Sequence, residues 1–219
     1  MNDRLIEILT SSFFEILIQG LKVTIPLTII SFAIALVIAL LVAIVQVANI
    51  KVAKQVARFY VWIIRGTPLI VQLFIVFFGL PSLGIVIDAF PSAIIVFSIN
   101  TGAYASETIR AAIEAVPKSQ FEAGYCVGMN YVQIMYRIIL PQAMRTAFPP
   151  LSNSLIGLVK DTSLAASITV VDMFLVAQRV AAQTYETFAL YMEVALVYLI
   201  FCTVLTKLQT VMEKRLRMD

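Results

Sequence analysis

The sequence has 219 residues, of which 61% are hydrophobic and 13% are charged. Soluble domains are about 45–50% apolar and about 25% charged, so a water-soluble fold could not bury this much apolar surface. Most of the chain is therefore expected to lie in lipid. Histidine is absent, which excludes histidine-based catalysis, metal binding and pH sensing. The net charge of +3 is small and scattered, which argues against binding to nucleic acid.

Five stretches are apolar enough to form membrane helices, which need roughly 20 residues. In chain order they are residues 23–50, 66–87 with a backward extension through RFYVWIIR, 89–106, 146–159 and 194–206. Residues 161–190 are too polar for a span and too apolar for a free loop, which predicts re-entrant or interfacial helices that line a cavity. We expect an all-α integral membrane protein with five transmembrane helices and one domain over residues 1–219.

The positions of lysine and arginine predict the orientation of these spans. With the N-terminus outside and the C-terminus in the cytoplasm, the inner loops and ends hold eleven of them. These are Lys51, Lys54, Arg58, Arg110, Lys118, Arg137, Arg145, Lys207, Lys214, Arg215 and Arg217. The outer side holds only Arg4, Lys22, Lys160 and Arg179, and Arg65 lies inside a span. The positive-inside rule favours this orientation, so the segment between the third and fourth spans is expected in the cytoplasm.

That cytoplasmic segment, residues 117–143, reads PKSQFEAGYCVGMNYVQIMYRIILPQA and is amphipathic. Ser119 and Glu122 have the spacing of a capping box, which predicts a short helix that begins near residue 120. Gly124 and Gly128 are four residues apart and are expected on one side of that helix, where each costs roughly 1 kcal/mol of helix stability relative to alanine. Close approach of another backbone would explain them. The helix either packs on its own membrane helices or inserts into a groove of a partner protein.

Part of this segment resembles the cytoplasmic signature of ABC importer permeases. The matching residues are Glu122, Ala123 and Gly124, then Gly128 after three residues, Ile138 after nine more, and Leu140-Pro141 after one more. Gly124 stands where that family commonly has a second alanine. The resemblance implies a type I ABC importer permease fold, in which this segment, about residues 117–141, contains a coupling helix seated in a cleft of the ATPase subunit. It assigns ATPase coupling to Glu122, Ala123, Gly124 and Gly128.

Three further stretches resemble the polar amino-acid permease group of that family. They are RGTPLIVQLFIVFFGLP (65–81), NTGAYASETIRAAIEAVPKSQFEAG (100–124) and PPLSNSLIGLVKDTSLAASI (149–168). The resemblance covers about residues 15–215, and within the group it is closest to bacterial cystine-type permeases. It implies uptake of a polar amino acid across the bacterial plasma membrane, with L-cystine favoured over arginine, glutamine or histidine.

The resemblance also implies partners. No nucleotide-binding Gly-x-x-x-x-Gly-Lys-Ser/Thr loop occurs among the eight glycines, so the chain itself is not expected to be an enzyme. ATP would be used by a dimer of separate ATPase subunits, whose closure drives alternating access. A second copy of the permease or a homologous one, and an extracytoplasmic solute-binding protein, would complete the importer. No metal or cofactor is expected in this chain.

Two charged residues within the spans predict an ion pair. Arg65 lies about two helical turns from Arg58, and Glu107 is expected at a similar depth on the third helix. An Arg65–Glu107 pair would serve structure or gating first and contact substrate second. Alternatively, Arg65 reaches back to lipid phosphates. Thr67-Pro68 predicts a kink next to Arg65, because Pro68 cannot donate a helical hydrogen bond.

Asp161, Asn100 and Ser163 are the candidate substrate-binding residues. Asp161 ends the span that begins near Pro149, within the apolar thickness of the bilayer. A carboxylate there could hold the ammonium group of an amino acid, and Asn100 and Ser163 offer short hydrogen-bonding groups to orient it. The alternative is that the adjacent Lys160 simply neutralises Asp161, although neighbouring residues on a helix do not face each other.

Two other classes of membrane protein remain to be weighed against the importer. An ion-coupled secondary transporter would usually show internal repeats and more spans, and neither is seen here. A silent membrane anchor would explain the hydrophobicity, but neither the glycine-bearing cytoplasmic helix nor Asp161. An intramembrane enzyme is least consistent with the sequence, because histidine and an obvious nucleophile–base pair are both absent.

Overall fold

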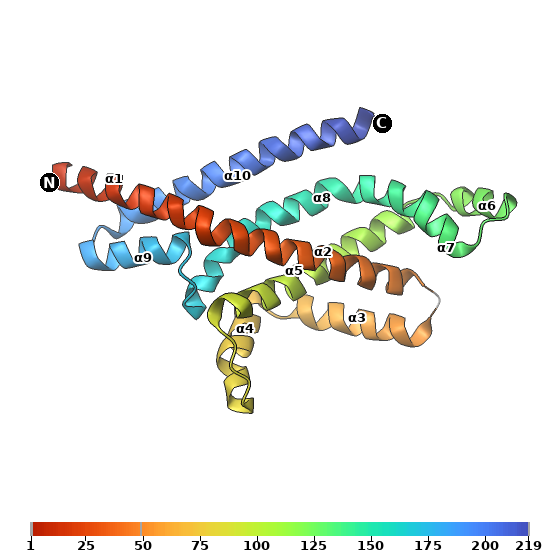
Figure 1. The fold of residues 1–219 in the computed structure, drawn as a ribbon, viewed down its shortest axis with the longest axis horizontal. Coiled ribbons are helices and arrows are strands. Elements are labelled where there is room, and N and C mark those ends of the chain that lie inside the picture. Colours follow the sequence, from red (N-terminus) through yellow and green to blue (C-terminus); the bar gives the residue numbers. More distant parts are fainter. Residues whose placement is uncertain (1, 49, 219) are drawn as a thin grey trace.

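A single long helix runs through most of the length of the molecule (Figure 1). The computed structural model describes residues 2–48 and 50–218, and every element in them is a helix. The long helix consists of α1 (Asn2–Gln19), a π-helical turn η1 (Gly20–Thr24) and α2 (Ile25–Val47). Its 45-residue apolar stretch Asp3–Val47 is about 68 Å long, roughly twice the thickness of a bilayer core.

The first expected span therefore begins too late, since residues 23–50 are only the second half of this helix. The acidic residues of the N-terminal half, Asp3, Glu7 and Glu15, lie on its exposed side. The opposite side is buried against α9 (Met173–Thr184) and α10 (Thr187–Met218). There Ser12 Oγ donates to Glu193 Oε2 of α10 at 2.5 Å. A charge on an exposed face does not end a helix, which is why the prediction failed at this end.

The second expected span is sharply bent. It comprises α3 (Lys51–Gly66), followed by α4 (Leu69–Phe74), the π-helical turn η2 (Ile75–Gly79) and the 3-10 turn η3 (Leu80–Leu83). The two halves make an angle of 103°. Thr67 and Pro68 both have extended backbones, so the helix is interrupted where the sequence predicts a kink. The α4–η3 arm projects away from the other helices (Figure 1).

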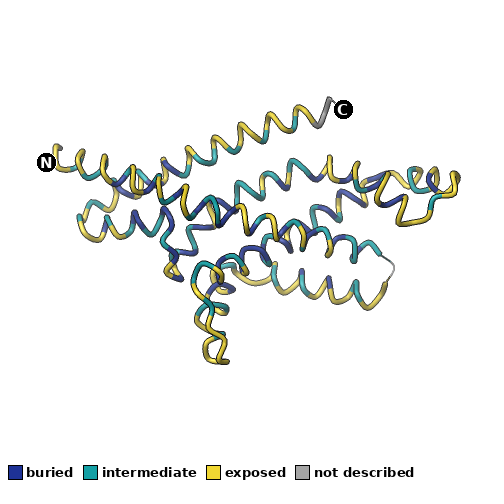
Figure 2. The backbone as a smooth tube through the Cα atoms, viewed as in Figure 1, coloured by how far each residue is buried: buried dark blue, intermediate teal, exposed yellow. Residues whose placement is uncertain are grey.

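Helix α5 (Ala89–Glu114) lies at the centre of the molecule and packs along α2. The contact consists of small residues: Ala35, Ala39 and Ala43 of α2 are fully buried, and an added Cβ on Gly102 of α5 would lie 3.0 Å from Ile38 Cγ2. Small residues at this spacing let two helix backbones approach closely in lipid. Figure 2 shows the resulting buried core along α5, whereas α3, the α4–η3 arm and most of α10 are largely exposed.

The rest of the chain forms a short helical hairpin and three longer segments. The hairpin is α6 (Lys118–Cys126) and α7 (Tyr131–Ile134), which continues through the π-helical turn η4 (Met135–Ile139) into α8 (Leu140–Asp161) and the 3-10 helix η5 (Thr162–Ile168). The stretch Tyr131–Ile168 meets α9 at 52°. The region expected to be re-entrant, residues 161–190, thus contains η5, α9 and the start of α10.

Length and composition identify two unbroken spans among the described residues, Asp3–Val47 and Thr187–Arg215, or four if each bent pair is one span. The remaining expected span, residues 89–106, is the first part of α5, which is long enough but less apolar. The N-terminus and α9 lie at one end of the molecule. The α2–α3 connection, the α6–α7 hairpin and the C-terminus lie toward the other end (Figure 1).

Candidate functional site

A cavity of about 610 Å³ opens between the end of α3, the start of α4, α5, α8 and η5. Arg65, Asn100 and Asp161 all line it, together with Tyr104 and Ser154. Three separate predictions therefore converge on one place, because the sequence suggests Asp161 and Asn100 as substrate ligands and Arg65 as a structural or gating residue. One basic and one acidic side chain in the same cavity could hold the two ends of a small zwitterion.

Gln72 organises the wall of this cavity, and sequence analysis did not single it out. Its Nε2 donates to Ile64 O at 2.9 Å and to Thr67 Oγ1 at 2.8 Å, so it satisfies groups left free where α3 ends. Its Oε1 accepts a bond from Asn100 Nδ2 at 3.0 Å. The side chain thereby links α3, α4 and α5 across the break. A buried glutamine four residues after a proline in an apolar run is the signal that could have revealed it.

Arg65 and Glu107 lie side by side, as their expected depth predicts. Arg65 Nη1 is 4.0 Å from Glu107 Oε2, the outer limit of an ion pair, and the guanidinium lies over the ring of Tyr104 at 5.1 Å. Glu107 has closer partners that sequence analysis missed. Arg110 Nη2 donates to it at 2.8 Å and Gln46 Nε2 at 3.0 Å. Arg65 is thus held weakly by Glu107 and remains 44% exposed, facing the cavity.

Ser163 does not share this cavity. It lines a different, apolar groove of about 570 Å³ between α8, η5, α9 and α10, and Lys160 lines the same groove. Ser163 Oγ donates to the backbone carbonyl of Lys160 at 2.7 Å. Because Lys160 and Asp161 line different spaces, the two residues do not face each other, as expected for neighbours on a helix.

The expected cytoplasmic helix is α6, and its capping differs from the prediction. It begins at Lys118 after Pro117, and the side chain of Ser119 makes no capping bond because it lies inside the helix. The capping box occurs at the next helix instead. Asn130 Oδ1 accepts from the Gln133 backbone N–H at 2.9 Å, and Gln133 Oε1 accepts from the Asn130 N–H at 2.9 Å. Pro117 occupies the N-cap position, so Ser119 is already the second residue of the helix and is not placed to cap it.

The two glycines of the signature do not form one helix face, which corrects the expectation. Gly124 is buried, and an added Cβ would lie 2.6 Å from Ile134 Cγ1, so the close neighbour is α7 of the same chain. Gly128 follows the end of α6 with φ of 77° and open space around it. The bonds from Gly128 N to Tyr125 O at 3.0 Å and from Met129 N to Gly124 O at 3.1 Å form a Schellman motif. Gly128 therefore terminates α6.

The side of the α6–α7 hairpin that faces away from the core is exposed and largely apolar. Glu122 and Ala123 are exposed, as are Tyr125 and Val127, which are 53% and 75% accessible. On the following turn, Val132 and Tyr136 are 72% and 74% accessible. The hairpin thus presents an uncovered apolar face whose inner side is tied to the core through Gly124 and Ile134.

Helices of membrane-spanning length, a polar cavity between them and a projecting short hairpin define a class of protein, the multi-pass membrane permease. Residues 35–218 match the family model described as "Binding-protein-dependent transport system inner membrane component". The chain belongs to this family.

Similar proteins and solved structures support the same family assignment. The chain is 47% identical over 211 residues to the L-cystine transport system permease protein TcyB of Bacillus subtilis (strain 168), covering 96% of this chain and 90% of that one. It is 34% identical over 202 residues to the arginine transport system permease protein ArtQ of the same organism, covering 92% of each. A chain from the structure titled "Crystal structure of an amino acid ABC transporter with histidines" matches with a TM-score of 0.87 and 33% identity, covering 94% and 96% of the two chains.

These matches confirm the predicted family, fold class and general function. The chain is a multi-pass inner-membrane permease of an amino-acid ABC importer. It works in a binding-protein-dependent system, so an ATPase and a solute-binding protein are its partners, and ATP hydrolysis belongs to the separate ATPase subunit. The alternatives of an ion-coupled transporter and a silent anchor are not supported by these relatives.

Proposed function

We propose that this permease imports L-cystine and holds one amino-acid end of it between Arg65 and Asp161. The observation that carries the proposal is the shared cavity, in which these two opposite charges and Asn100 face one space between transmembrane helices. The carboxylate of Asp161 would bind the substrate ammonium group, and the guanidinium of Arg65 the substrate carboxylate. Asn100, fixed by Gln72, would orient the ligand.

The choice of cystine is supported by the identity to TcyB, which is higher than that to ArtQ. Glutamine and arginine are the next candidates, supported by the 38% identity to the putative glutamine transport system permease protein GlnP of Rickettsia bellii (strain RML369-C) and by the 34% identity to ArtQ. Glutamine and histidine remain compatible with a site that recognises only the two charges common to all amino acids.

Transport would proceed by alternating access driven by the ATPases. We infer a dimer of permeases, formed by two copies or by one copy and a homologue, with a dimer of ATPases that contacts the exposed side of α6 through Glu122, Ala123 and Tyr125. We infer that the N-terminus is outside and the C-terminus cytoplasmic. The α2–α3 connection, the α6–α7 hairpin and the C-terminus lie toward one end of the molecule (Figure 1), where most lysines and arginines are also found, which supports this orientation.

The test is ATP-dependent uptake in liposomes that contain the permease, its ATPase and its binding protein. Labelled L-cystine should accumulate only with ATP, and excess unlabelled cystine should compete better than arginine or glutamine. Preferred uptake of arginine would support the importer mechanism but show that arginine, not cystine, is the substrate. Uptake that does not depend on ATP would contradict the proposed mechanism.

A further inference from the structure

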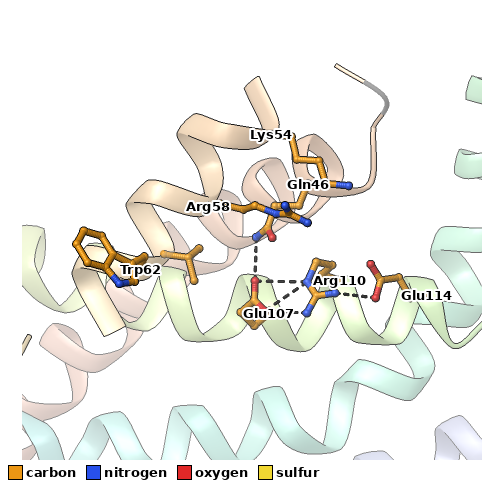
Figure 3. Close-up of a pocket in the computed structure, with 8 residues that line it drawn as sticks. Gln46, Lys54, Arg58, Trp62, Glu107, Arg110 and Glu114 are labelled. Atoms are coloured by element: carbon orange, nitrogen blue, oxygen red, sulfur yellow. Dashed lines mark hydrogen bonds and ion pairs between the residues drawn. The ribbon is translucent and has the colours of Figure 1, made fainter. Parts of the chain in front are cut away.

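A second polar cavity lies nearer the α2–α3 connection than the first. It has a volume of about 300 Å³ between α2, α3 and α5, and six of its eight lining residues are polar or charged: Gln46, Lys54, Arg58, Glu107, Arg110 and Glu114 (Figure 3). Charged residues on membrane helices commonly mark substrate or ion pathways.

The charges of this cavity are unequally satisfied. Arg110 is bound on both sides, to Glu107 at 2.8 Å and to Glu114 at 2.6 Å, and Gln46 also donates to Glu107 (Figure 3). Both carboxylates are therefore occupied by Arg110. Among residues 2–48 and 50–218, no carboxylate lies within 4.0 Å of Lys54 or Arg58. The cavity thus offers two adjacent cations without an anionic partner, an arrangement that favours a carboxylate ligand.

Both cavities are lined by the same faces of the same two helices. On α3, Arg65 lines the first cavity, and Arg58 and Lys54 line the second. Arg58 lies seven residues before Arg65, and Lys54 lies four residues before Arg58. On α5, Asn100 and Tyr104 line the first cavity and Glu107 and Glu114 the second, again at the spacing of one helix face. Arg65 and Arg58 are about 10 Å apart along the helix axis.

The boundary between the cavities is the weak Arg65–Glu107 contact at 4.0 Å. A substrate carboxylate that leaves Arg65 would next meet Arg58 and Lys54 in the second cavity. Glu107, which lies between them, would repel this carboxylate only weakly, because Arg110 neutralises its charge. We propose that the second cavity is an exit site, in which Lys54 and Arg58 bind the carboxylate of the transported amino acid before its release. This inference rests on the proposed function, since it requires an amino-acid substrate in the first cavity.

An exit site should also be accessible to amino acid from the side to which it opens. The experiment uses liposomes with the binding protein and labelled L-cystine enclosed, and with the ATPases and ATP outside. Unlabelled L-cystine added on the ATPase side should slow transport by occupying the second cavity. In a Lys54→Gln, Arg58→Gln variant, the half-inhibiting concentration should rise roughly tenfold, the effect of losing charge-assisted hydrogen bonds.

Control variants make the result specific. Lys51→Gln removes a charge from the same helix outside the cavity lining and should behave as the unmodified protein. A Lys54→Arg, Arg58→Lys variant keeps both charges and should retain the inhibition, which separates lost binding from misfolding. An unchanged half-inhibiting concentration in the double glutamine variant, or no inhibition in the unmodified protein, would overturn the exit site.

Two further outcomes identify other causes. If the effect of the double variant occurs in vesicles with phosphatidylglycerol and disappears in phosphatidylcholine vesicles, the two cations bind lipid phosphates and the exit site is overturned. If the unmodified complex transports no amino acid at all, the proposed function itself is wrong, and with it the exit site that depends on it. An inhibition shift that is independent of lipid charge supports the exit site.

Discussion

Gly124 shows how one residue sets the contact between the α6–α7 hairpin and the core of the molecule. Its missing side chain makes room for Ile134, which is fully buried among residues of α2, α5 and α8. The family commonly has alanine at this position, and in this chain the space for that methyl group is filled by isoleucine. A movement of α6 would therefore be transmitted to the core through a contact between α6 and α7.

Gly124→Ala should destabilise the hairpin by about 1–3 kcal/mol, because the new methyl group would overlap Ile134. We expect lower thermal stability in detergent and weaker stimulation of the ATPase by substrate. In an Ile134→Ala background, Gly124→Ala should cost much less than in the unmodified protein, since alanine lacks the Cγ1, Cγ2 and Cδ1 atoms that lie nearest the added methyl group. An equal cost of Gly124→Ala in the two backgrounds would show that the steric explanation is wrong.

The site residues were predictable to different degrees. Arg65, Asn100 and Asp161 could be identified because charged and amide side chains are conspicuous in apolar spans. Their convergence on one cavity could not, because it depends on the 103° break after α3 and on the packing of α8 against α5. Ser163 was proposed for its short hydrogen-bonding side chain, but residues two positions apart on a helix point in nearly opposite directions, and Ser163 lines a different groove from Asp161.

At the scale of elements, Asp172 fixes the start of α9 and its position against α10. It is fully buried, its Oδ1 accepts from the Leu175 N–H at 2.9 Å, and its Oδ2 accepts from the hydroxyl of Tyr198 at 3.1 Å. The first bond caps α9 and the second ties it to α10. A buried carboxylate in the loop before α9 thus holds α9 and α10 together.

Asp172→Ala should lower the free energy of unfolding by about 2–3 kcal/mol, because it removes the cap and leaves Tyr198 without its acceptor. Asp172→Asn should cost less, since asparagine is an equally good N-cap. Asp88→Ala is a matched control, because Asp88 precedes α5 without making a capping bond and is exposed. Equal melting temperatures for Asp172→Ala and Asp88→Ala would contradict this role.

Element types were more predictable than element ends. Apolar runs located α2, α5 and α10, and Pro68 located the break after α3. The N-terminal half of the long helix was missed because its charges lie on one exposed face, and α8 was expected to begin at residue 146 although the helix runs without interruption from Tyr131. Pro149 and Pro150 lie inside α8. Because proline has no N–H, the carbonyls of Arg145 and Thr146, four residues earlier, lose their usual backbone donor, which membrane helices tolerate when neighbouring groups or water satisfy them.

At the scale of the whole molecule, the two cysteines report the orientation in the membrane. Cys126 is exposed on α6, and Cys202 lies in the middle of α10. In the proposed orientation Cys126 faces the cytoplasm. In a Cys202→Ala variant without its ATPase, a membrane-impermeant maleimide should label Cys126 in inverted vesicles and not in right-side-out vesicles.

A cysteine placed at the opposite end of the molecule tests the same orientation from the other side of the membrane. Phe188 is 81% exposed near the start of α10, and Phe188→Cys in a variant without the other cysteines should be labelled only from outside. The reverse pattern for both sites would invert the proposed topology. Added ATPase should protect Cys126 and leave the reporter at position 188 reactive, because only α6 is expected in the interface.

The most direct test of the substrate site is equilibrium binding of labelled L-cystine to the purified permease–ATPase complex without the binding protein. Asp161→Asn and Arg65→Gln should each weaken binding at least tenfold, since each removes a charge-assisted hydrogen bond of about 1.5–3 kcal/mol. Lys160→Gln, on the other side of α8, should bind as the unmodified protein does. Binding that is undiminished in the Asp161 and Arg65 variants would show that the cavity is only a passage and that the amino acid is recognised elsewhere.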